Sequence, residues 1–252
     1  MSTRRALLVA SPDIPNDVLP GARIDVENFA DFLTSLEGGA WERAEIRQLF
    51  NPTKTELLQA VRELSWVDYA FLTFSGHGCH RVSRELSETS LKLTTNESCN
   101  VVEVNPRNDR HLLVIDACRA IVREPDRFIR SRLTAMANAL PRTITREKAR
   151  SLFEDAYSAA DAGHAVIYSC KVGQAAGESQ YGGYFSRSLV GVSSSWACSA
   201  SPNEVLSVRS AFDLAQTKTF DLNAPQWAEL EAGRRLRHFP LAVSVTPVPI
   251  YG

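Results

Sequence analysis

Four short, uninterrupted runs of mostly apolar residues constrain the fold of this 252-residue chain more than any other feature of its sequence. They cover residues 7–10, 70–74, 112–115 and 165–168. Continuous apolar runs of this length are typical of strands buried on both faces of a largely parallel sheet. A weaker strand candidate covers residues 45–50, where polar and apolar residues alternate. The runs therefore predict a mostly parallel central sheet.

The segments between these runs carry helix signals. Apolar residues at i, i+3, i+4, i+7 spacing predict an amphipathic helix over residues 23–36, ended by Gly38 and Gly39, and a similar face covers residues 149–160. Two capping boxes predict further helix starts: Thr53 with Glu56, and Ser201 with Glu204, where Pro202 takes the first helical position. Strands that alternate with helices indicate an α/β domain with right-handed crossovers.

Two chemically distinctive motifs directly follow two of the predicted strands. Ser75-Gly76-His77-Gly78 comes after the second run, and Asp116-Ala117-Cys118-Arg119 comes after the third. Sites in open α/β sheets form beyond the carboxyl ends of the strands, so we expect His77 and Cys118 to lie close together. A nearby imidazole raises the thiolate fraction of a cysteine, whose free pKa is about 8.5. We expect the backbone amides of Gly78 and Cys118 to face the oxyanion of an acyl-transfer intermediate.

These motifs resemble those of the caspase and metacaspase superfamily of cysteine peptidases, in which the histidine lies roughly 50 residues before the cysteine. Here the separation is 41 residues. Three further segments resemble family motifs: 21–26 after the first strand, 168–174 with Cys170 and Gln174, and 183–189 at a helix start. The resemblance implies a caspase-like three-layer α-β-α sandwich and an endopeptidase in which His77 is the general base and acid and Cys118 the nucleophile.

The residue two positions before the cysteine distinguishes the branches of this superfamily. It is Asp116 here, as in metacaspases, whereas caspases carry glutamine. The resemblance then implies that Asp25, Ser75 and Asp116 form an acidic pocket for the residue before the cleaved bond, called P1. A carboxylate pair suits the bidentate hydrogen bonding of a guanidinium. We therefore expect cleavage after arginine or lysine. The chain departs from the metacaspase pattern at Arg119, Ala120 and Val172-Gly173.

The resemblance also divides the chain, which we expect to be one domain over residues 1–252. Residues 1–120 correspond to the large-subunit part with the dyad, 121–163 to an arginine-rich intersubunit segment, and 164–252 to the small-subunit part. An enzyme that cuts after arginine can process such a segment itself. The candidate self-cleavage sites are Arg130, Arg132, Arg142 and Arg146.

Composition narrows the classes of partner that we expect this chain to bind. The net charge of −1, without a basic block, gives no reason to expect nucleic acid, and no apolar stretch is long enough to span a membrane. Five cysteines without regular spacing indicate reduced thiols and a cytoplasmic location. We expect a protein substrate, an activating or inhibitory protein partner, and no cofactor. The resemblance allows bound calcium, but no acidic loop in the sequence demands the metal. The resemblance also allows a role in a prokaryotic cell-death or antiviral pathway.

Three other interpretations compete with this one. The first is a catalytically silent caspase-fold scaffold, but such proteins usually lack the histidine or the cysteine that this chain retains. The second is a flavodoxin-like domain that binds a phosphate ligand, but residues 75–78 do not match a phosphate-binding fingerprint. The third is a zinc site at His77, Cys79 and His80, whose spacing is poor for structural zinc.

Overall fold

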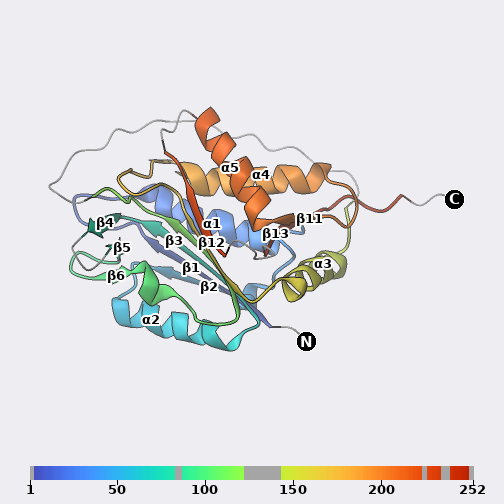
Figure 1. The fold of residues 1–252 in the computed structure, drawn as a ribbon, viewed down its shortest axis with the longest axis horizontal. Helices are drawn as coiled ribbons and strands as arrows, with labels where there is room; N and C mark the ends of the chain where they lie inside the picture. The colour runs from blue at the N-terminus through green and yellow to red at the C-terminus, as the bar shows by residue number, and fades with distance from the viewer. Residues whose placement is uncertain (1–2, 83–86, 122–142, 223–225, 234–238, 250–252) are drawn as a thin grey trace.

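The computed structural model describes residues 3–82, 87–121, 143–222, 226–233 and 239–249 (Figure 1). Its central sheet is mostly parallel, as predicted, and only the edge strand β12 is antiparallel to its neighbour. All five predicted strands are present. The order across the sheet is β12 (Glu229–Ala232), β8 (Gly163–Tyr168), β7 (Arg110–Asp116), β3 (Tyr69–Gly76), β1 (Arg4–Ser11), β2 (Ile46–Phe50).

Helices cover both faces of this sheet (Figure 1). Because strand side chains alternate between faces, Leu8 and Phe71 pack into one apolar core, and Leu7 and Leu72 into the other. The first core is completed by four helices: α1 (Pro20–Thr34), α3 (Arg146–Ala159), α4 (Tyr184–Ser199) and α5 (Val208–Asp221). The second is completed by α2 (Lys54–Glu63) and a small sheet of β4 (Gly78–Val82), β5 (Ser87–Lys92) and β6 (Ser98–Asn100). The result is the expected three-layer α-β-α sandwich.

Two further strand pairs complete the described structure. One is the hairpin of β9 (Glu178–Ser179) and β10 (Gly182–Gly183), which lies against α1. The other joins β11 (Val205–Ser207) to β13 (Pro240–Val243). No helix in the described part of the chain is long and apolar enough to cross a membrane.

The helix predicted at the second capping box is wrong. Residues 201–204 form a turn between α4 and β11, in which Asn203 has a φ of 65°, outside the right-handed helical region. Glu204 does accept the Ser201 amide at 3.2 Å, as a capping box requires, but here that bond closes a turn. The helix begins later, after Ser207, whose hydroxyl accepts the Ser210 amide. The first capping box is confirmed, since Thr53 and Glu56 cap α2 reciprocally.

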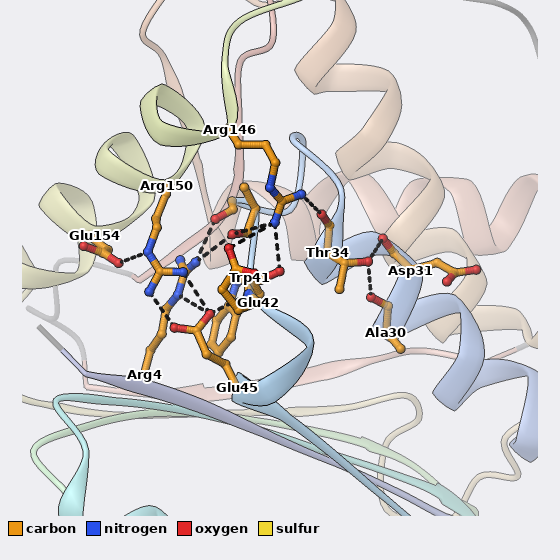
Figure 2. Close-up of polar contacts among 12 residues, drawn as sticks. Arg4, Ala30, Asp31, Thr34, Trp41, Glu42, Glu45, Arg146, Arg150 and Glu154 are labelled. Atoms are coloured by element: carbon orange, nitrogen blue, oxygen red, sulfur yellow. Dashed lines mark hydrogen bonds and ion pairs between the residues drawn. The ribbon is translucent and has the colours of Figure 1, made fainter.

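A cluster of arginines and glutamates at the amino end of the sheet anchors α3 (Figure 2). The Arg4 side chain in β1 is fully buried, and its guanidinium donates to the carbonyls of Gly39 and Ala40. Glu45 lies 3.4 Å from Arg4 and accepts two hydrogen bonds from Arg150 of α3, at 3.0 and 2.5 Å. The charge of the buried arginine is therefore balanced by a carboxylate that also binds the helix.

Arg146, one of the four candidate self-cleavage sites, is part of this cluster (Figure 2). It is the first residue of α3, and its guanidinium donates to the carbonyls of Thr34, Ala40 and Trp41 at 3.0–3.4 Å. It cannot enter a protease pocket without leaving these partners and opening the first turn of the helix. The other three candidates, Arg130, Arg132 and Arg142, lie outside the described residues.

Candidate active site

The register between two central strands places the predicted dyad. β3 and β7 are parallel neighbours, and Ser75 lies opposite Asp116 as their last pair. His77 and Cys118 each lie two residues beyond this pair, so they leave adjacent strands at the same level. The sheet therefore presents the imidazole and the thiol at one edge, where α/β domains place their sites.

The backbone of Gly78 touches the turn that carries the cysteine. A Cβ atom at this position would lie 2.8 Å from the Ala117 Cβ and 2.8 Å from the Cys118 carbonyl oxygen. Any side chain would therefore push the two turns apart. The glycine that follows the histidine is required because the two turns are in direct contact.

A loop residue that the sequence did not single out orients His77. The Nε2 atom of His77 lies 2.6 Å from the carbonyl oxygen of Asp17 and 3.4 Å from the carboxylate of the same residue. A carbonyl can only accept, so Nε2 carries the hydrogen, and in the neutral ring Nδ1 is left to take up a proton. Nothing in the local sequence around Asp17 distinguishes it from an ordinary loop residue.

The Cys118 thiol is partly buried and lies 3.7 Å from the carbonyl oxygen of Ala176. Burial raises the pKa of this thiol, and the carboxylates of Asp116, Asp17 and Glu178 raise it further. The backbone hydrogen bond with Ala176 opposes this rise in pKa, and burial outweighs it. These surroundings disfavour the thiolate, so deprotonation of Cys118 calls for a base.

The three predicted pocket residues converge beside the dyad. Asp25, Ser75 and Asp116 are only 2%, 6% and 5% exposed. The Ser75 hydroxyl donates to Asp25 at 2.5 Å, and the Gly183 amide donates to the other oxygen of the same carboxylate at 2.9 Å. A Cβ atom at Gly183 would clash with Asp116 and lie 3.2 Å from Asp25. The two carboxylates therefore face the same stretch of backbone.

Asp116 lies at the amino end of α4. It accepts hydrogen bonds from the amide and the hydroxyl of Ser186, at 3.2 and 2.6 Å, in the first turn of that helix. The positive end of the helix dipole favours the charged carboxylate there. Sequence reasoning matched Gly183 and Ser186 to a family helix start but did not assign them to the pocket.

Burial dominates the titration of this carboxylate pair. It raises the pKa of Asp25 well above its ordinary value, and the charge of Asp116 raises it further. Burial also raises the pKa of Asp116, against the hydrogen bonds from Ser186. Two buried carboxylates so close together favour a bound cation, which would relieve their repulsion.

No group of three or more His, Cys, Asp or Glu side chains is arranged to hold a metal ion among the residues that the structure describes. His80, one of the zinc candidates, has both ring nitrogens bonded to hydroxyls, Nδ1 to Thr89 at 3.1 Å and Nε2 to Ser87 at 3.0 Å.

Comparisons with known proteins agree with this architecture. No curated protein matched the sequence. Among solved structures, the chain is similar to caspase-1 from Spodoptera frugiperda, with a TM-score of 0.60 and 13% sequence identity over 93% of this chain and 88% of the other. At that identity the likeness shows the fold alone. The family model described as the caspase domain matches residues 3–232, so the chain belongs to the caspase-domain family of cysteine peptidases.

Proposed function

We propose that the protein is a cysteine endopeptidase that cleaves peptide bonds after a basic residue. One observation carries the proposal: two buried carboxylates, Asp25 and Asp116, face the same backbone at Gly183. Asp116 lies two residues before Cys118, which leaves its strand in register with His77. A P1 guanidinium or ammonium would neutralise that pair.

The expected chemistry is acyl transfer. As substrate binds, Nδ1 of His77 takes the thiol proton, and the sulfur of Cys118 bonds to the scissile carbonyl carbon. The backbone amides of Gly78 and Cys118 donate to the oxyanion. When the carbon–nitrogen bond breaks, His77 gives its proton to the leaving amine and a thioester remains. His77 then activates water, which breaks the thioester and restores the thiol.

The raised pKa of the resting thiol is consistent with this order of events. Since burial raises the pKa of Cys118, the imidazole acts as a base during attack and does not hold a preformed thiolate. Substrate binding that excludes water and neutralises the acidic pair would remove one of the charges that disfavour the thiolate.

A second candidate is a caspase-fold scaffold that binds a protein partner without catalysis. The two candidates differ in whether a substrate-like cation binds at the site. A scaffold has no reason to bind a basic side chain beside Cys118, whereas the peptidase does.

The test is an assay with fluorogenic peptides that differ only at P1 (Arg, Lys, Asp, Leu), with and without calcium. Cleavage after Arg that vanishes in Cys118→Ala and falls at least tenfold in Asp116→Ala is expected. Cleavage only after Asp or Leu would leave the dyad and overturn the acidic pocket. If no peptide is cut and the scaffold is the true function, Cys118 will also gain no protection from alkylation by basic side-chain analogues.

A further inference from the structure

A groove of about 930 Å³ lies among the helices on one face of the central sheet. Its walls come from α1, α4 and α5, and α4 packs against both of the other helices (Figure 1). Among the described residues that line it, neither His77 nor Cys118 is present. Its volume falls in the range of small-molecule sites, about 300–1,000 Å³. The groove is therefore a second candidate binding site, separate from the dyad.

The walls of the groove are mainly apolar. Ile24 contributes from α1, Trp196 from α4, Leu214 from α5, and Leu222 from the end of α5. Leu214 is 43% exposed, and the other three are partly exposed. Water is thus in contact with apolar side chains from three helices. Because removing apolar surface from water is favourable, an apolar occupant would be stabilised there.

α4 leaves room for an occupant at Gly191, in the middle of the helix. Gly191 is exposed and lines the groove, and an added Cβ atom would meet no described neighbouring element within 4 Å. A glycine inside a helix is destabilising relative to alanine. Here no described neighbour requires the missing side chain. The groove is therefore open at the point where a larger residue would fill it.

The charged residues that line the groove are cations. They are Arg187 of α4 and Lys218 of α5, and the described lining includes no aspartate or glutamate. The guanidinium carbon of Arg187 lies 5.3 Å from the centroid of the Tyr181 ring. The Lys218 ammonium has no ion-pair partner among the described residues. An occupant with a negative charge would complement both cations.

The groove extends to the β9–β10 hairpin. Tyr181, in the turn of the hairpin, belongs to the lining, and its carbonyl accepts a hydrogen bond from Nδ2 of Asn28 at 3.3 Å. Gly183 follows two residues later, and its amide donates to Asp25. An occupant would therefore contact the turn of a hairpin whose second strand is bonded to the candidate active site.

We propose that this groove binds a small amphiphile, a molecule with an apolar body and one anionic head group. The apolar body would lie against Ile24, Trp196 and Leu214, and the head group would lie beside Lys218 and Arg187. A bound molecule would hold the turn of the β9–β10 hairpin, so the groove is placed to regulate the candidate active site. The site does not depend on which residue the protein cleaves after.

The test measures binding of decanoate and decylamine, which share an apolar chain and differ in charge, to the whole protein by isothermal titration calorimetry. Decanoate should bind the wild type about tenfold more tightly than decylamine, since both cations repel the amine. Gly191→Leu places a side chain in the open groove and should weaken decanoate binding by about tenfold. It should not lower the unfolding temperature, because leucine is a better helix former than glycine. Lys218→Gln should weaken decanoate binding by about fivefold.

Hydrogen–deuterium exchange tests the contact with the hairpin. In the wild type, decanoate should slow exchange in a peptide that covers residues 178–184 by about twofold or more. In Gly191→Leu, decanoate at the same concentration should leave that exchange unchanged. Exchange that decanoate does not slow in the wild type would overturn the regulatory position of the groove.

The matched control is Lys148→Gln, which removes an exposed lysine in the first turn of α3, outside the groove lining. Its affinity for decanoate should equal that of the wild type. Equal affinity of the wild type and Gly191→Leu for decanoate would place binding elsewhere and overturn the site. Equal affinity of the wild type for decanoate and decylamine would overturn the anionic head group. If decanoate does not bind the folded wild type, the groove does not take a small anionic amphiphile, and the inference fails.

Discussion

Arg119, the residue directly after Cys118, donates to Glu229 at 2.5 Å although 110 residues separate them. Its guanidinium also lies 3.8 Å above the ring of Tyr168 and donates to Thr89 at 3.0 Å. The Arg119 side chain is only 4% exposed, and Glu229 belongs to β12, the edge strand of the sheet. The backbone beside the nucleophile is therefore held by a side chain that reaches the last strand.

This relationship predicts that Arg119 positions Cys118. Arg119→Lys keeps the charge but loses the planar fork and the ring stacking, so kcat should fall about tenfold or more while KM changes little. Glu229→Gln should have a smaller effect in the same direction, since the glutamate is 39% exposed. The measurement is steady-state kinetics on the preferred peptide of the panel described above.

The control for the edge strand is Glu231→Gln, two residues along β12 and exposed. Its kcat and KM should match those of the wild type. If Arg119→Lys lowers the unfolding temperature but leaves kcat unchanged, the arginine has only a structural role.

The pH dependence of Cys118 alkylation should reveal the burial of its thiol. Because the pKa of Cys118 is raised, the iodoacetamide rate should increase with pH through a midpoint above the value of about 8.5 that is typical of free cysteine. Asp116→Asn removes a negative charge that raises this pKa, so its midpoint should be lower. Glutathione under the same conditions gives the reference. A wild-type midpoint below that of glutathione would contradict the assigned environment and indicate a preformed thiolate.

The acidic pair should make stability depend on pH in a defined direction. A carboxyl whose pKa is raised in the folded state stabilises the fold at low pH, and that contribution is lost as pH increases from the unfolded value of about 3.9 through the raised one. Asp116→Asn lacks one such group. Its unfolding temperature, relative to wild type, should therefore increase between pH 4.5 and 7.5 by about 3 °C or more, equivalent to about 1 kcal/mol in a protein of this size.

The control for that measurement is Asp221→Asn, at the exposed end of α5. The difference between its unfolding temperature and that of the wild type should be the same at every pH. A relative unfolding temperature of Asp116→Asn that falls with increasing pH would show that the hydrogen bonds from Ser186 outweigh burial.

The sequence predicted the features that are determined within short segments, namely the buried strands and the residues that directly follow them. Each apolar run forms a buried strand, and because parallel strands end at one edge, the positions of His77 and Cys118 followed from the residues directly after two of them. The wrong helix prediction at Ser201 has the same origin. The hydrogen bond that the Ser201 amide donates to Glu204, three residues later, can close a turn as well as a helix start.

Contacts between distant segments were not predictable in this way. Asp17 lies in a loop and Glu229 in an edge strand without a long apolar run, so neither carries a local signal of its role. Their importance arises from contacts made after folding, with the imidazole of His77 and the guanidinium of Arg119. Periodicity along the chain contains no information about such partners.

The last prediction concerns self-cleavage. Arg146 holds the first turn of α3 by donating to three backbone carbonyls, so a cut after it would have to break that turn (Figure 2). If the active protein processes itself, intact mass spectrometry should show no new chain that begins at Glu147, and Arg146→Gln should still be processed. Arg146→Gln should also lower the unfolding free energy by about 1–2 kcal/mol, because those carbonyls lose their charged donor. Cys118→Ala, which cannot process itself, gives the uncut reference mass. A fragment beginning at Glu147 in active protein but absent from Cys118→Ala would show that the first turn of α3 opens and would overturn this assignment.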